Sequence, residues 1–377
     1  MSSGAMPAIA LDCRLASWPG IGRYCRELAR ALVAVAPAQP FVWLCHRSSS
    51  EQCRDLPASG VVRRIELRSA PMSVGEQFEV PWILSRNRIG LLHAPAAQTW
   101  PLLAPRAVVT VHDLTLRHFP EFLPSRMGRL YYAIMVGAAV RRARRLVAVS
   151  RFTRDDVVQA WPQAASSARV VLNGVSTGFK PVVDGVERER VRLDLDLPRN
   201  FLLFVGTWKR HKNLPTLLEA YARLDAGQQD RCPLVVVADV DPRYPEVPET
   251  ARRLGLSDRI RWRSGVPDAS MPALYSMARA VVLPSLYEGF GLPVAEAFAC
   301  GTPAVVSAAG ALPEVGADAC LSFPPLDADA LCAALARMIG DDALHARLSA
   351  RALERASAFD WTVAARQVLA IYREALA

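Results

Sequence analysis

The strongest constraint on the fold is residues 281–307, where an apolar strand, a glycine-containing loop, a helix and a second apolar strand follow one another directly. The first strand ends at Pro284, and the loop carries Gly289 and Gly291. Pro293 stands where a helix begins, because its fixed φ suits the first helical turn and its missing N–H costs no hydrogen bond there. Strands that alternate with helices in this way predict a parallel, doubly wound α/β sheet.

The start of this helix predicts an anion site, because its first N–H groups have no internal partner and the helix dipole adds positive charge. Two carboxylates bracket the site, Glu288 in the loop and Glu296 one turn into the helix. Acids beside a phosphate repel it unless they reach past it to hydroxyl groups. The pattern therefore indicates a nucleotide-sugar, with Glu288 on the sugar and Glu296 on the ribose. The alternative is an ordinary strand-to-helix turn whose acids are solvated.

The stretch resembles the Glu-x7-Glu region of retaining glycosyltransferases with two Rossmann-like domains, the GT-B architecture. The match covers both acids, their spacing, Pro293 and the glycine loop. The resemblance implies that Glu288 is catalytic and orients sugar hydroxyls without serving as a nucleophile. It also implies a donor site made of Gly289, Phe290, Gly291, Leu292 and Glu296.

Length and composition predict two domains of similar size. A chain of 377 residues is too long for one ordinary domain, and 51% of it is hydrophobic. Its Val-, Ile-, Leu- and Ala-rich runs are typical of strands covered on both faces. We expect an α/β fold with Rossmann-like domains at 1–178 and 179–360, joined by a polar linker at 176–196. The resemblance adds a central cleft between the domains and a C-terminal helix, 361–377, that crosses back to the first domain.

The distribution of charge limits the classes of partner that the protein can bind, and the cysteine usage indicates its compartment. Residues 1–180 carry 23 Lys and Arg against 11 Asp and Glu, whereas residues 181–377 carry 22 against 25. A basic first half attracts phosphorylated substrates or an anionic membrane, and nucleic acid is not expected because aromatic residues are not interleaved with the basic ones. The eight cysteines lack metal or redox spacing, and residues 1–8 lack a secretory signal, so we expect reduced thiols in a cytoplasmic protein.

An early Gly-x-Gly loop precedes the first expected helix. Gly20 and Gly22 are followed by Arg23, but Cys25 occupies the third glycine position of a dinucleotide fingerprint. A plain tight turn is an equally good interpretation of the residues alone. The loop is similar to the Gly-x-Gly-Arg-Tyr loop of the same family, which implies that Gly20, Gly22 and Arg23 approach the donor diphosphate.

His112 and Asp113 follow an expected strand at 107–111. Ligands of open α/β sheets bind outside the carboxyl ends of strands, so this polar pair is well placed, although a His satisfied by loop hydrogen bonds fits as well. The family resemblance implies that His112 faces the transferred sugar and that Asp113 orients it or contacts the acceptor.

Residues 126–145 predict one helix with an apolar centre and basic ends. Its apolar part, 130–140, is too short for a membrane span, which needs about 20 residues. Two interpretations remain: a buried helix of the domain, or a basic flank that rests on anionic lipid near a lipid-linked acceptor.

The second domain begins with a strand at 201–205 and a basic turn, which by itself is also compatible with a solvated loop. Gly206, Thr207, Lys209, Arg210 and Lys212 form this turn. The resemblance implies that Lys212 grips the diphosphate and offsets the charge of the leaving group. Many members have an Arg at the position of Thr207, so either Lys209 or Arg210 replaces it or one cation is missing.

Two further features bear on the donor and on metals. The resemblance places Val266 against the nucleotide base. Asp239-Val240-Asp241 follows an apolar strand, as in metal-dependent transferases, but Asp-x-Asp also occurs at 194–196 and 327–329. We therefore expect neither a metal nor a cofactor.

Together these motifs are most similar to bacterial mannosyltransferases of surface polysaccharide synthesis. The expected reaction moves mannose from GDP-mannose to a glycan or lipid-linked acceptor, at the inner face of the plasma membrane. Alternatives are a UDP-sugar, ADP-sugar or GDP-deoxyhexose donor, a metal-dependent transferase, a non-catalytic nucleotide-sugar-binding protein, and an NAD-dependent sugar-nucleotide enzyme. The last of these lacks its third glycine and the acid after the second strand.

Overall fold

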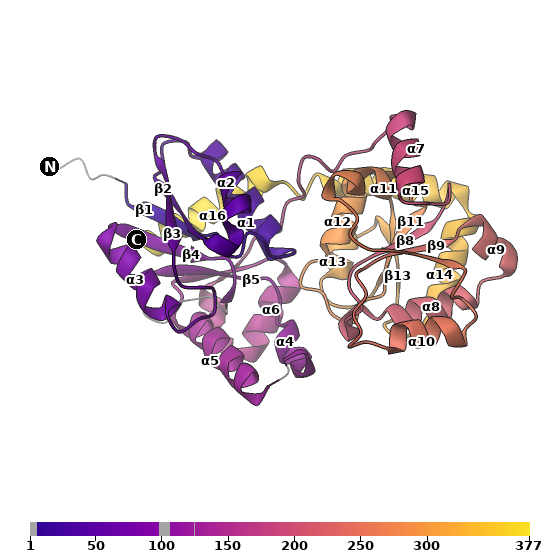
Figure 1. Cartoon of the computed structure of the whole chain (residues 1–377), viewed down its shortest axis with the longest axis horizontal. Helices are drawn as coiled ribbons and strands as arrows, with labels where there is room; N and C mark the ends of the chain where they lie inside the picture. Colours follow the sequence, from indigo (N-terminus) through magenta and orange to yellow (C-terminus); the bar gives the residue numbers. More distant parts are fainter. Residues whose placement is uncertain (1–5, 98–105, 124) are drawn as a thin grey trace. The chain divides into compact units, whose positions relative to one another are not determined.

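A computed structural model of the chain describes residues 6–97, 106–123 and 125–377. It forms two compact units (Figure 1). Unit 1 contains residues up to Gly174 together with Asp360–Ala377, and unit 2 is Val175–Phe359. Among the described residues, no helix combines the length and hydropathy that a membrane span requires.

Unit 1 is built on a seven-stranded sheet in the order β3-β2-β1-β4-β5-β6-β7, in which all neighbouring strands are parallel. The strands are β1 Ala8–Asp12, β2 Phe41–His46, β3 Val62–Leu67, β4 Ile89–Ala94, β5 Ala107–Val111, β6 Arg145–Ala148 and β7 Ala168–Val170. The helices are α1 Ile21–Val35, α2 Ser50–Arg54, α3 Glu76–Arg86, α4 Thr115–His118, α5 Arg126–Arg142, α6 Arg151–Ala160 and α16 Trp361–Leu376, with short 3-10 turns η1 Arg47–Ser49, η3 Pro120–Phe122 and η4 Pro162–Ser166.

Helices cover both faces of this sheet. Side chains of α1 and the C-terminal helix α16 share one buried cluster, and side chains of α3 and α5 share the cluster on the opposite face. Gly174 lies directly against Trp361 at the start of α16, where a Cβ would come within 2.5 Å of the Trp361 backbone nitrogen. The amphipathic pattern of the last helix is therefore explained by its packing in the core of unit 1.

Unit 2 repeats the architecture with six parallel strands in the order β10-β9-β8-β11-β12-β13. The strands are β8 Leu202–Val205, β9 Leu234–Val237, β10 Ile260–Arg263, β11 Ala280–Leu283, β12 Ala304–Ser307 and β13 Cys320–Phe323. The helices are α7 Gly185–Asp194, α8 Leu214–Ala222, α9 Ala226–Arg231, α10 Glu246–Arg253, α11 Met271–Met277, α12 Leu292–Ala299, α13 Leu312–Gly316, α14 Ala328–Gly340 and α15 Asp342–Ala356, with 3-10 turns η5 Arg210–Lys212 and η6 Asp268–Ser270.

Two parallel, doubly wound sheets confirm the predicted fold class, whereas two local predictions were wrong. The polar segment 176–196 is not only linker, because its charged residues form α7, which Asp184 caps and which packs on α11. Helix α5 ends at Arg142, since β6 already begins at Arg145. Helix α12 begins at Leu292, with Pro293 inside its first turn as expected.

Candidate active site

The centre of the candidate site in unit 2 is an ion pair between Lys212 and Glu288. Lys212 Nζ donates to Glu288 Oε1 at 2.7 Å, and only 16% and 11% of the two side chains are exposed. Ser285 Oγ donates to the same oxygen at 2.7 Å. Burial by itself would raise the pKa of Glu288, but the Lys212 charge and these hydrogen bonds outweigh burial and hold it below its ordinary value of 4.5. Glu288 is therefore a fixed, ionised carboxylate.

Two loops from neighbouring strands bring this pair together. Lys212 ends the turn after β8, and Glu288 lies in the loop after β11, the strand next to β8 in the sheet. Leu286 N donates to His211 O at 2.7 Å, and Asn213 Nδ2 donates to Pro284 O at 3.1 Å. The carboxyl ends of adjacent parallel strands thus place the predicted cation beside the predicted acid.

The loop that carries Glu288 is supported from behind by the segment after β12. Ala311 N donates to Glu288 O at 2.9 Å, and Ser307 Oγ donates to Ser285 O. Gly310 has φ +61, and a Cβ there would lie 2.6 Å from Glu288 N. A side chain at Gly310 would therefore displace the Glu288 backbone.

Helix α12 begins directly after this loop. Gly291 is its N-cap with φ +99, a conformation that favours glycine, and no side chain of the described residues caps the helix. Phe290 is buried and packs edge-on against Phe359. The N-terminal N–H groups of α12 and the Lys212 ammonium are thus two sources of positive charge in the loops at this end of the sheet.

Glu296 is buried in α12, with 4% of its surface exposed. Tyr275 in α11 donates its hydroxyl to Glu296 Oε2 at 3.0 Å. The interpretation of Glu288 and Glu296 as solvated acids of an ordinary turn is therefore wrong, because Glu288 is mostly buried, Glu296 is almost fully buried, and both accept side-chain hydrogen bonds. Ser285 and Tyr275 hold the two acids, and neither was a predicted site residue.

The other basic residues of the turn after β8 are directed elsewhere. Arg210 is exposed and pairs with Glu246 of α10 at 3.5 Å. Lys209 is half-buried within the electrostatic reach of Asp241, and Thr207 is exposed beyond Gly206 at the end of β8. Lys212 is thus the cation of this turn that binds Glu288. Many family members have an Arg at the position of Thr207. That Lys209 or Arg210 takes its place, or that one cation is missing, stays a prediction.

Val266 and the Asp-x-Asp segment have structural partners. Val266 is partly buried and packs against the core cluster that includes Leu274 and Tyr275. Asp241 binds the Arg243 guanidinium through both carboxylate oxygens, at 2.9 and 2.6 Å. Over the described part of the chain, no cluster of three or more His, Cys, Asp or Glu residues has the arrangement of a metal site.

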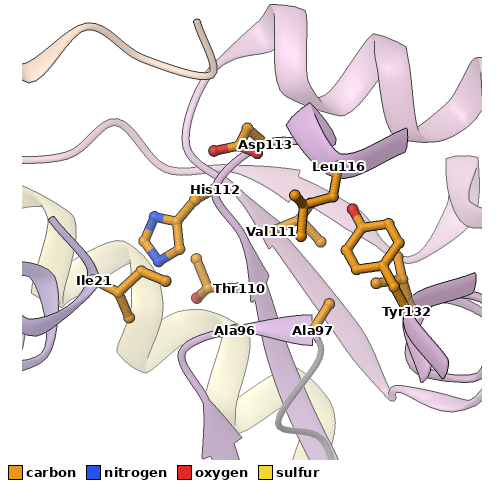
Figure 2. Close-up of a pocket in the computed structure, with 10 residues that line it drawn as sticks. Ile21, Ala96, Ala97, Thr110, Val111, His112, Asp113, Leu116 and Tyr132 are labelled. Carbon is orange, nitrogen blue, oxygen red and sulfur yellow. The ribbon is translucent and has the colours of Figure 1, made fainter. Parts of the chain in front are cut away.

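In unit 1, His112 lies at the carboxyl end of β5 and lines a cavity of about 50 Å³ (Figure 2). Its Nε2–H donates to Pro95 O at 2.8 Å, which leaves Nδ1 as the acceptor of the neutral ring. Burial lowers the pKa of His112, although Asp113 and the Pro95 carbonyl oppose this effect. Tyr24 packs edge-on against the ring at 4.8 Å. His112 is therefore a neutral, oriented imidazole, and one of its nitrogens is satisfied by the loop.

Asp113 and the glycine loop border the same region of unit 1. Asp113 Oδ1 accepts from Thr115 N at 2.8 Å, so this acid fixes the start of α4. Ile21, between the two predicted glycines, lines the cavity with His112. Gly20 has a φ of +72, a conformation that favours glycine. Gly22 is required for a different reason, because a Cβ there would overlap the Ala16 carbonyl. Arg23 is half-buried in the first turn of α1.

Known glycosyltransferases match this protein over almost the whole chain. Residues 185–355 match the family described as glycosyl transferases group 1, and residues 18–179 match glycosyltransferase family 4. O-antigen chain mannosyltransferase B of Escherichia coli is 31% identical over 372 residues, which cover 94% of this chain and 96% of the relative. MMP alpha-(1->4)-mannosyltransferase of Mycolicibacterium hassiacum is 34% identical over 329 residues, covering 84% and 75%.

Solved structures show the same fold. Sucrose-phosphate synthase from Thermosynechococcus elongatus has a TM-score of 0.79 at 23% identity, with 97% of this chain and 98% of that chain covered. Anabaena HepE in complex with UDP-glucose has a TM-score of 0.76 at 18% identity, with 97% and 99% covered. The chain is a glycosyltransferase and belongs to the glycosyl transferases group 1, with the GT-B fold.

Proposed function

We propose that this glycosyltransferase is a retaining, metal-independent hexosyltransferase of surface polysaccharide synthesis, and that it transfers mannose from GDP-mannose to a glycan or lipid-linked acceptor. The observation that carries the site assignment is the buried Lys212–Glu288 pair beside the uncapped start of α12. The choice of mannose and of polysaccharide is supported by the names of the two mannosyltransferase relatives.

The leaving group of the transfer is a nucleoside diphosphate, whose negative charge grows as the sugar departs. Lys212 and the N–H groups at the start of α12, in the segment from Gly289 to Leu292, would stabilise that charge. Electrostatic stabilisation of this kind in a protected site is usually the largest contribution to catalysis. Gly20, Gly22 and Arg23 of unit 1 would approach the same diphosphate.

The two acids have separate roles in this proposal. Glu288 is held ionised by Lys212 and Ser285, which both bind Oε1, so Oε2 can accept hydrogen bonds from sugar hydroxyls. Glu296, oriented by Tyr275, would accept hydrogen bonds from the ribose hydroxyls. His112 would accept a hydrogen bond from the transferred sugar through Nδ1, with Asp113 toward the acceptor.

Val266 would lie against the base, with Gly206, Thr207, Lys209 and Arg210 along the donor. The basic excess of residues 1–180 supports peripheral contact with the anionic inner face of the plasma membrane, where a lipid-linked acceptor would be met.

A thermal-shift panel of GDP-, UDP- and ADP-sugars tests the donor. A ligand at about 100 times its dissociation constant stabilises the native state by about 2.7 kcal/mol, and we expect this from GDP-mannose. NMR of the product should show the anomeric configuration of the donor, and turnover should survive a chelator. Release of no nucleoside diphosphate with any acceptor, including water, would make the chain a binding protein instead.

A further inference from the structure

Four buried side chains of unit 1 form a hydrogen-bonding network that runs from the C-terminal helix α16 to helix α1. The Tyr372 hydroxyl lies 2.6 Å from His93 Nδ1, and His93 Nε2 lies 2.7 Å from Thr110 Oγ1. The Tyr24 hydroxyl lies 2.9 Å from the same threonine oxygen. Each of the four residues is at most 5% exposed. We propose that this Tyr372–Tyr24 network positions His112 for the transfer, an inference that rests on the proposed function of His112.

The network reaches His112 through the ring of Tyr24. The two rings meet edge-on, with centroids 4.8 Å apart and an interplanar angle of 88°. The contact between the Tyr24 hydroxyl and Thr110 ties the far end of the tyrosine ring to β5. The Tyr24 ring therefore cannot turn away from His112 without breaking this contact. Figure 2 shows the Thr110 side chain beside the His112 ring, as expected for residues two positions apart in an extended segment.

Two contacts then define the orientation of the His112 imidazole. The Pro95 carbonyl accepts from Nε2 at 2.8 Å and fixes one edge of the ring, but a single hydrogen bond leaves the tilt of the ring free. The edge-on contact with Tyr24 restricts that tilt. The direction of Nδ1, which would accept from the transferred sugar, thus depends on where Tyr24 is held. A small misplacement of such a group costs rate, because the reaction needs aligned partners.

The network carries no charge. Burial lowers the pKa of His93 to about 3, so at neutral pH its ring carries a single N–H. Burial raises the pKa of Tyr24 and that of Tyr372, so both hydroxyls keep their hydrogens. Each of the four groups therefore holds one hydrogen, which is enough for all the contacts of the network. A buried polar network whose contacts are all made favours one arrangement of its side chains.

Packing alone does not require these polar groups. Tyr24 and Tyr372 belong to the apolar cluster beneath α1 and α16, where phenylalanine would fill nearly the same volume. Buried polar groups cost free energy unless they are hydrogen-bonded, so an apolar core has no use for His93 between them. Trp361, at the start of α16, also packs edge-on against Tyr24, with ring centroids 5.6 Å apart. Helix α16 thus supports the ring that contacts His112 by two routes.

The first test observes the His112 ring directly in the whole chain. Labelling with ¹³C at Cε1 gives one NMR signal for each of the six histidines, and loss of a signal in His112→Ala identifies that of His112. Thr110→Val should shift the His112 signal although Tyr24 itself is unchanged, and Thr110→Ser should restore it. Tyr372→Phe should shift it less, because His93 still binds Thr110. An unshifted His112 signal in Thr110→Val and Tyr372→Phe would overturn the inference.

The second test separates positioning from packing. Tyr24→Phe and Thr110→Val should lower kcat for GDP release from GDP-mannose by about 3- to 10-fold, the range of one hydrogen bond, and leave the affinity for GDP unchanged. In a His112→Ala background the same substitutions should have no further effect, because they act only through this ring. Tyr221→Phe is the matched control, since it removes a buried hydroxyl that donates to Gln229 O in unit 2. It should change neither kcat nor the His112 signal.

The outcomes separate this inference from the proposed function. Losses of kcat that persist in the His112→Ala background would assign the network to packing and overturn the inference, while the donor site stands. A wild-type protein that neither binds GDP-mannose nor releases GDP would reject the proposed function. In that case a shifted His112 signal in Thr110→Val still supports the positioning of the ring, and an unshifted signal overturns it.

Discussion

Lys212 Nζ and Glu288 Oε1 lie 2.7 Å apart although 76 residues separate them in sequence. The two residues come from loops after β8 and β11, which are neighbours in the sheet of unit 2. The pair is mostly buried, so each charge depends on the other for its stability in the folded protein. This dependence leads to the first two predictions.

Removal of one partner should destabilise the protein more than removal of both. Lys212→Met or Glu288→Gln alone should lower the free energy of unfolding by roughly 1–3 kcal/mol, because a buried charge loses its counter-charge. The double variant should recover part of that loss. Chemical denaturation of all four proteins gives the coupling energy, and additive losses would show that the pair does not interact in solution.

The stability that Glu288 contributes should depend on acid pH. Its pKa in the folded protein is below the ordinary value of 4.5, so the folded state binds this proton more weakly than the unfolded chain. The contribution is therefore complete above that value and is lost as the pH falls through the lower folded pKa. The difference in unfolding free energy between wild type and Glu288→Gln should therefore be constant at higher pH and shrink as the pH falls below about 4.5. A constant difference would contradict the depressed pKa.

Substitution of Glu288 and substitution of Glu296 should have different effects on donor binding and turnover. Glu288→Ala should abolish turnover while much of the GDP binding remains, since its partner is the sugar. Glu296→Ala should weaken the thermal shift by GDP itself, and Tyr275→Phe should do so to a smaller extent because it removes only the hydrogen bond that orients Glu296. Wild-type turnover in both alanine variants would refute the assignment.

His112 should act as a neutral imidazole. Burial lowers its pKa from 6.5, so the ring stays unprotonated at neutral pH and charges only in more acidic solution. Turnover of the wild type should therefore show no His112 titration between about pH 6.5 and 8. His112→Ala should lower kcat and leave the GDP thermal shift unchanged, whereas a lost GDP response would place His112 in nucleotide binding.

Gly310 offers a test of the loop support. Gly310→Ala adds a Cβ 2.6 Å from Glu288 N, and Gly301→Ala is the matched control because its φ is also positive, at +78, but its nearest neighbour is the flexible Leu353 side chain at 3.6 Å. The control should cost about 1 kcal/mol of backbone strain, and Gly310→Ala about 3 kcal/mol together with most of the turnover. Equal effects on stability and turnover would show that the loop tolerates displacement.

The sequence predicted those parts of the fold and site that depend on residues close to one another in the chain. The glycine loop before Pro293 marked the helix that begins at Leu292, and the repeated strand-helix pattern predicted both parallel sheets. The family resemblance selected Lys212 among the cations of its turn, and the structure shows it bound to Glu288. The loop, the helix start and the two sheets depend on turn chemistry and hydrophobic pattern, which a sequence displays directly.

The partners of the site residues could not be predicted in the same way. Tyr275 lies on α11, so its contact with Glu296 depends on tertiary packing against α12. Ser285 is only three residues before Glu288, and it reaches this acid because of the conformation of their shared loop. Arg210 was predicted along the donor, but only the structure shows its pairing with Glu246 in α10. The burial of Glu296 likewise depends on α11 packing beside α12.

A crystal structure of the protein soaked with GDP-mannose tests the central claim most directly. The account predicts the diphosphate at the start of α12 within hydrogen-bonding distance of Lys212, with the mannose on Glu288 and the ribose on Glu296. A donor bound elsewhere, with the Lys212–Glu288 pair and the N-terminus of α12 left without contact to it, would contradict the account.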